Sequence, residues 1–182
     1  GNNDREYVSQ GVQFIANWDP MLWGLGHEFE FGFRYHQDYI ERKHTTDSFL
    51  MSDGQLVTDG NASVATTTNK DSADAIALYI HDKVQVDGWT FTSGLRAEFI
   101  ETTREDRSPA NNADIDAEDA VVIPGLGVHY QINDQLGLLA GINKGFSPVG
   151  PGQDSDIDPE ESINYEAGFR YYKGAFSTEL IG

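Results

Sequence analysis

A strict two-residue alternation of side chains over residues 162–171 constrains the fold more than any other feature of the sequence. Apolar side chains take every second position, and polar or small ones take the positions between. This period predicts an extended strand with one apolar and one polar face. The polar face carries Glu166 and Arg170, and the continuous apolar face suits lipid. The pattern is typical of a transmembrane barrel strand, an all-β antiparallel structure.

The same alternation recurs along the chain and predicts about eight strands. In residues 27–41 it places Phe29, Phe31 and Phe33 on one face. Asp87-Gly88 is a strong two-residue hairpin signal. The expected strands cover residues 7–18, 27–41, 73–86, 89–103, 120–132, 136–146 and 162–173, with another beginning at 175. The long connections that we expect are 42–72, 104–119 and 147–159. Short and long connections thus alternate, as they do in outer-membrane barrels.

The aromatic residues and strand lengths agree with a membrane barrel. Trp18, Trp23 and Trp89 all stand beside short connections. Indole rings prefer the membrane–water boundary, so we expect an aromatic girdle on that side. Several expected strands have about 13 to 15 residues. Because ~9–11 residues cross a bilayer, these strands project beyond the membrane on the side of the long connections.

Composition excludes several classes of protein. The net charge is −18, so nucleic acid is a poor partner. The chain has no cysteine, and therefore neither a disulfide nor thiolate chemistry. No run of 18 apolar residues predicts a transmembrane helix. The sequence offers no catalytic motif, no metal-ligand spacing of histidines and no cofactor site, so we expect no enzyme.

Several short segments resemble the barrel of TonB-dependent outer-membrane receptors, in the correct order along the chain. These segments are ALYIHD at 77–82, FTSGLR at 91–96, NKGFSP at 143–148 and NYEAGFRY at 164–171. The segment GFRYHQDY at 32–39 is similar to the ferric-dicitrate-receptor branch. The resemblance implies a barrel of 22 strands in the bacterial outer membrane, with an N-terminal plug inside it. It also implies uptake of a ferric siderophore, cobalamin or a sugar, with energy relayed by TonB, and among these we expect a ferric chelate.

On this reading residues 1–182 are part of the barrel, about eight of its strands, and the plug domain and TonB box are absent from them. The expected partners are a ferric chelate such as a siderophore or ferric citrate, the receptor's own plug, the TonB complex through that plug, and outer-membrane lipid with lipopolysaccharide. Transport by this segment alone is not expected.

Two groups of charged residues on the expected lumen face are candidate site residues. Arg34, His36 and Asp38 lead toward a long connection, where a ligand enters, and an arginine binds a carboxylate in bidentate fashion. Contact with the plug or with neighbouring strands is the alternative for these three. The second group is expected to contact the plug or to pair across strands, and it comprises Arg96, Glu98, Glu166 and Arg170.

The acidic loops raise two further questions. Asp154, Asp156 and Asp158 form a D-x-D-x-D pattern, but Pro159 and Tyr165 occupy the positions where an EF-hand needs glycine and glutamate. We therefore expect a solvated acidic loop there, with a looser cation site as the alternative. Acidic residues over 104–119 form a negative rim, which slows the approach of an anionic chelate.

Two other architectures remain open from the sequence alone. One is a soluble acidic β-sandwich that binds carbohydrate or calcium. The other is a small outer-membrane barrel that closes at about this length, since eight strands are enough to close a barrel.

Overall fold

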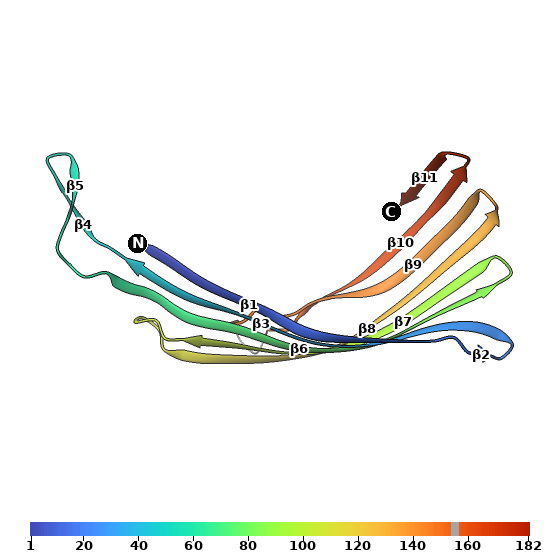
Figure 1. The fold of residues 1–182 in the computed structure, drawn as a ribbon, viewed down its shortest axis with the longest axis horizontal. Helices are drawn as coiled ribbons and strands as arrows, with labels where there is room; N and C mark the ends of the chain where they lie inside the picture. Colours follow the sequence, from blue (N-terminus) through green and yellow to red (C-terminus); the bar gives the residue numbers. More distant parts are fainter. Residues whose placement is uncertain (154–156) are drawn as a thin grey trace.

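The structure is a computed structural model that describes residues 1–153 and 157–182. The regular secondary structure in those residues consists of β-strands alone. Nine strands form one sheet, and eight of them follow the order β1-β3-β6-β7-β8-β9-β10-β11. All neighbours in this sheet are antiparallel. The sheet bends into a long trough (Figure 1). The described residues contain no helix that is long and apolar enough to cross a membrane.

The strand bounds confirm the eight predicted strands and add three short ones, β2, β4 and β5. The strands are β1 (Asn2–Trp18), β2 (Met21–Leu22), β3 (Leu25–Thr46), β4 (Phe49–Ser52), β5 (Gln55–Thr58), β6 (Val64–Val86), β7 (Trp89–Asp106), β8 (Ala113–Asn133), β9 (Leu136–Ser147), β10 (Glu160–Lys173) and β11 (Phe176–Ile181). β2 pairs with the start of β3, and β4 with β5 forms a separate hairpin in the connection between β3 and β6.

Two of the expected long connections are wrong in extent, because the strands continue much farther than the sequence indicated. β3 ends at Thr46 and β6 begins at Val64, so the connection is 47–63 and not 42–72. Likewise the connection between β7 and β8 is 107–112 and not 104–119.

The extensions of β3, β6 and β7 are largely polar on both faces, so no alternation marks them. In the β8 extension Ala113, Ile115 and Ala117 alternate with acidic residues, but these three share a face with Arg104 and not with the lipid-facing side chains. Cross-strand ion pairs such as Arg104 of β7 with Asp71 of β6 support the pairing there.

The opposite ends of the strands meet in tight turns. Asp87 and Gly88 both have positive φ, 45° and 83°, as a type I′ hairpin turn requires, which confirms the predicted turn. Trp23 and Gly24 have the same combination, 52° and 80°. Aromatic rings gather at this end. Trp89 stacks on Tyr130 with 4.3 Å between ring centroids, and Trp18 stacks on Phe29 at 5.9 Å.

The apolar face of the sheet is uncovered and its two edge strands do not pair, which together contradict the two alternative architectures. Phe14 is 68% exposed and Tyr165 is 72% exposed, whereas a soluble sandwich buries such side chains under a second sheet. In the described residues β1 and β11 form opposite edges of the sheet and do not pair. The sheet is therefore an open wall with one apolar face, and it is not a small closed barrel.

Candidate functional site

The arginines of this chain are concentrated on the polar face of the sheet. Strand registers place six of the seven arginines on that face, and Arg107 lies in the connection after β7. The six are Arg5, Arg34, Arg42, Arg96, Arg104 and Arg170. The alternation of each strand gives this placement directly, because residues that pair across strands share a face. The polar face thus carries most of the cationic groups of a chain whose net charge is −18.

The densest group lies at the end of the long connections, and we call Arg5, Arg42, Arg104, Asp71 and Asp106 the arginine cluster. Arg104 donates to Asp71 in bidentate fashion, from Nε to Oδ1 at 2.6 Å and from Nη2 to Oδ2 at 2.9 Å. Arg42 donates from Nη1 to Oδ2 of the same carboxylate at 2.9 Å. Asp71 is only 5% exposed, so its charge needs both partners.

The arginine cluster has a surplus of positive charge. Arg5 lies directly opposite Arg42 in the pairing of β1 with β3, and like charges in that position repel. Three guanidinium groups share the cluster with two carboxylates, which leaves one positive charge in excess. The hydrogen bonds from Arg104 to Asp71 raise the pKa of Arg104 further above its usual value. The guanidinium therefore stays charged at every pH that a cell meets.

The segment after β9 lies against this part of the polar face. The Val149 backbone N–H donates to Asp119 Oδ2 at 3.1 Å, and the Val149 side chain is only 6% exposed. Gly152 passes directly over Arg104, since a Cβ on Gly152 would lie 2.4 Å from the guanidinium. Gly152 also has a φ of +79°, which an L side chain rarely adopts. Residue 152 therefore has no room for a side chain while Arg104 keeps its position.

The predicted residues Arg34, His36 and Asp38 form a chain of hydrogen bonds along β3. His36 Nε2 lies 2.8 Å from Asp38 Oδ2, and Arg34 Nη2 lies 3.3 Å from His36 Nδ1. The consistent assignment has Nε2–H donating to Asp38 and Nδ1 accepting from Arg34. Because β3 continues to Thr46, Asp38 lies eight residues, about 26 Å, below the strand end. These residues are deeper in the wall than the sequence indicated.

The other predicted polar-face residues lie farther from the long connections. Arg96 Nε donates to Glu98 Oε1 at 2.5 Å within β7. Arg170 pairs with Glu179 of β11, with 2.7 Å between Nε and Oε2. Glu166 lies beside Gly141 of β9. The structure therefore does not bring these four residues into one group. A hollow of about 480 Å³ opens beside Arg96.

Sequence reasoning missed the arginine cluster because it assigned Arg42, Asp71 and Arg104 to connections. A signal was nevertheless present in the spacing. Arg42 follows Arg34 by eight residues, and Arg104 follows Arg96 by eight, so each pair shares a face if the strand continues. If the two-residue alternation is extended beyond the last apolar residue of each strand, it places Arg42 and Arg104 on the polar face.

No group of three or more His, Asp or Glu side chains suited to a metal ion occurs in residues 1–153 and 157–182. Asp154 and Asp156 of the D-x-D-x-D pattern lie outside the described residues.

Comparison with known proteins identifies the family of barrels to which this sheet belongs. A family model described as "TonB dependent receptor-like, beta-barrel" matches residues 1–180. The chain belongs to the TonB-dependent receptor family. These receptors are bacterial outer-membrane proteins and transporters, not enzymes, so the apolar face of the sheet meets lipid and the polar face lines the barrel interior. The predicted fold class, family and location are confirmed.

Individual relatives agree with this assignment. The metal-pseudopaline receptor CntO of Pseudomonas aeruginosa (strain UCBPP-PA14) is 30% identical over 110 residues, which are 56% of this chain and 15% of that receptor. The unliganded ferric citrate transporter FecA superposes with a TM-score of 0.81 at 25% identity, over 98% of this chain and 27% of that chain. The siderophore receptor PiuA of Acinetobacter baumannii superposes with a TM-score of 0.68 at 16% identity, over 93% of this chain and 29% of that chain. The chain therefore spans less than a third of the length of these TonB-dependent receptors.

Proposed function

We propose that this chain forms part of the wall of a receptor that takes up an anionic ferric chelate, a siderophore or ferric citrate, with energy from TonB. The supporting observation is the concentration of arginines on the interior face, with a positive surplus in the arginine cluster. A chelate with carboxylate groups suits these donors, because a guanidinium binds a carboxylate through two parallel N–H bonds.

Unused hydrogen-bonding capacity supports this proposal. Within the described residues Arg42 donates to Asp71 only through Nη1. Among the described residues Arg34 has no carboxylate within ion-pair distance, and its side-chain hydrogen bond is to the His36 ring. Both side chains thus have N–H groups to offer to an incoming anion. The names of two relatives, a ferric citrate transporter and a metal-pseudopaline receptor, describe receptors for chelated metal.

The acidic rim is less of an obstacle than the sequence indicated. Registers place Glu105, Asp114, Asp116 and Glu118 on the outward side of β7 and β8, while Arg104 faces the interior. An anion that enters along the interior face therefore meets the arginine cluster before it meets these carboxylates. We also propose, as part of the same function, that the wall encloses the receptor's own plug and that the plug contacts TonB.

Charge-neutralising substitutions in the receptor, made in outer membranes, test the proposal. Arg42→Gln combined with Arg34→Gln is expected to weaken binding of radiolabelled ferric citrate at least tenfold. Assembly is expected to stay intact, because Arg104 keeps its two bonds to Asp71 and the glutamine amide can still donate to that carboxylate. Arg107→Gln is the matched control, because Arg107 lies outside the interior face and pairs with Asp114. Equal binding by the double variant and the control, with ferric citrate and with an anionic siderophore, would refute the assignment of these arginines.

A further inference from the structure

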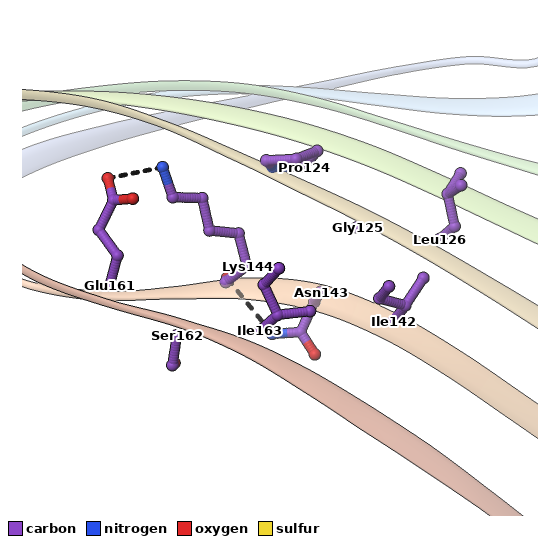
Figure 2. A pocket seen from close by; sticks show the side chains of 9 residues that line it. All are labelled: Pro124, Gly125, Leu126, Ile142, Asn143, Lys144, Glu161, Ser162 and Ile163. Carbon is purple, nitrogen blue, oxygen red and sulfur yellow. Dashed lines mark hydrogen bonds and ion pairs between the residues drawn. The ribbon is translucent and has the colours of Figure 1, made fainter.

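The connection after β9 folds back over the interior face of the sheet, and we call its residues 148–153 the strap. The pairing of β8 with β9 stops at Gly125 with Asn143. Beyond that point the two strands diverge and leave a crevice of about 640 Å³ between them (Figure 2). The strap then returns to β8, where the Val149 backbone N–H donates to the Asp119 carboxylate. The strap is therefore a separate layer on the interior face and not an extension of β9.

A tight turn fixes the middle of the strap. The Gln153 N–H donates to the Gly150 carbonyl oxygen at 3.3 Å, which closes a four-residue turn. Pro151 and Gly152 take its two central positions. Gly152 has a φ of +79°, as the second central residue of a type II turn requires, and proline is favoured before it. With the Val149 side chain only 6% exposed, the strap is anchored at one end and has a preorganised turn at the other.

Gly152 and Asp71 hold Arg104 from two directions. The Nε and Nη2 groups of Arg104 donate to the two oxygens of Asp71. A Cβ on Gly152 would overlap Cζ, Nε and Nη1 of the guanidinium at nearly equal distances, which places residue 152 over the face of the planar group. The carboxylate thus occupies one edge of the guanidinium, and the strap covers one face.

The position of Arg104 decides how much of Arg42 remains free. Asp71 is only 5% exposed, so its charge needs a cationic partner at all times. While Arg104 supplies two hydrogen bonds, Arg42 supplies one through Nη1 and keeps its other N–H groups. If a side chain at residue 152 displaced Arg104, Asp71 would take more of the Arg42 donors.

We propose that Gly152 is a positioning residue of the arginine cluster, which keeps Arg104 on Asp71 and so leaves the donors of Arg42 to an anionic chelate. Glycine meets both demands of this position, since it has no Cβ to overlap the guanidinium and it adopts positive φ without strain. The effect on the chelate rests on the proposed function, whereas the position of Arg104 does not.

Modification of arginines by phenylglyoxal, mapped by peptide mass spectrometry on the receptor in outer membranes, tests the position of Arg104 without any chelate. Gly152→Ala is expected to raise the reactivity of Arg104 several-fold and to lower that of Arg42. Gly150→Ala is the matched control and should change neither, because Gly150 lacks a positive φ and a Cβ there would meet nothing within 4 Å. Unchanged reactivity of Arg104 in the assembled Gly152→Ala receptor would overturn the inference.

The heat-dependent gel mobility of the folded barrel shows whether each variant assembles. If Gly152→Ala does not assemble, Gly152→Asn replaces it, because asparagine tolerates positive φ better and still carries a Cβ.

Binding of radiolabelled ferric citrate tests the consequence for the ligand. Gly152→Ala is expected to weaken binding about tenfold, which corresponds to the loss of one charge-assisted hydrogen bond. In an Arg104→Lys receptor the same substitution should cause no further loss, because no guanidinium lies under residue 152. A general distortion of the strap would instead weaken binding equally in both backgrounds, and that result would refute the positioning role.

The inference and the proposed function fail in different ways. If Arg42→Gln with Arg34→Gln weakens binding but Gly152→Ala does not, the positioning role is wrong and the chelate site stands. If neither variant weakens binding while Arg104 becomes reactive in Gly152→Ala, the proposed function is wrong and the hold of Gly152 on Arg104 stands.

Discussion

The two ends of the strands are built on different principles. At one end, adjacent strands join in turns as short as Asp87-Gly88, and stacked pairs such as Trp89 with Tyr130 gather there. At the other end, β3, β6, β7 and β8 continue well past the apolar stretch and are joined by longer connections. Charge pairing dominates that second end, with the nearly buried Asp71 at its centre.

The difference follows from what surrounds each end. A strand segment in hydrocarbon must keep its lipid-facing side chains apolar, so the alternation is strict there. Beyond the membrane water reaches both faces, and cross-strand hydrogen bonds and ion pairs alone hold the sheet together. The arginine cluster therefore lies where the sequence has the weakest pattern.

The largest expected effect comes from placing a charge on the lipid side. Phe31→Lys is expected to cost ~2–4 kcal/mol near the middle of the bilayer and to remove most of the assembled protein from outer membranes. The heat-dependent gel mobility of the folded barrel measures assembly. Asn17→Lys is the control on the opposite face, where the new ammonium lies across from Glu30. Equal assembly of the two variants would reverse our assignment of faces.

A smaller loss is expected at the charged end. Asp71→Ala removes the shared acceptor of Arg42 and Arg104 and leaves three arginines close together. The cost should be about 2 kcal/mol, because both guanidinium groups are partly exposed and recover some hydration. The change in the free energy of unfolding is measured by urea unfolding of the receptor in detergent micelles. Asp38→Ala serves as the comparison, since Asp38 is half exposed and bonds only to His36 among the described residues. An Asp71 variant as stable as the Asp38 variant would contradict the central role of Asp71.

The tight turns give a third test. Gly88→Val places a β-branched side chain at a φ of 83° and should cost about 1–2 kcal/mol, measured as a lower urea midpoint. Gly94→Ala is its control, because Gly94 lacks a positive φ and a Cβ there would meet nothing closer than 3.8 Å. If both substitutions lower the midpoint equally, the turn geometry is not the cause.

The smallest effect concerns the connection after β7. Hydrogen bonds from Ser108 hold the pKa of Asp106 below its usual 3.8. Because the folded-state pKa is lowered, the stabilisation is complete above pH 3.8 and disappears as the pH falls through the lowered value. NMR titration of the carboxyl carbon should show this midpoint, and Ser108→Ala should raise it. Asp114, whose pKa is lowered mainly by Arg107, should not respond to Ser108→Ala, and a response would point to a general change in the connection.

The sequence predicts the fold well where lipid restricts it. The alternation from Phe29 to Phe33 and the Asp87-Gly88 turn lead to the correct strands and faces, and short motifs lead to the family. The alternation also places Arg34 and Arg96 on the polar face. It does not reveal that β3 runs to Thr46, since residues 42–46 are polar on both faces.

The arginine cluster depends on the register of four strands, which no local pattern contains. Asp71 receives Arg42 from β3 and Arg104 from β7, and Arg5 of β1 lies opposite Arg42. Each residue alone looks like part of a polar connection. Only the pairing of distant segments brings these charges together.

A spin-label scan along β3 tests the central claim most directly. Residues 1–182 contain no cysteine, so single cysteines at positions 28–45 each carry one label once any cysteine elsewhere in the receptor is replaced by serine. Between 28 and 36 we expect odd positions to be accessible to oxygen from the lipid, and even positions to a water-soluble nickel chelate. Beyond Tyr39 both sets should be accessible to the chelate. Access of the chelate to odd and even positions alike between 29 and 35 would contradict the account of one lipid face and one interior face.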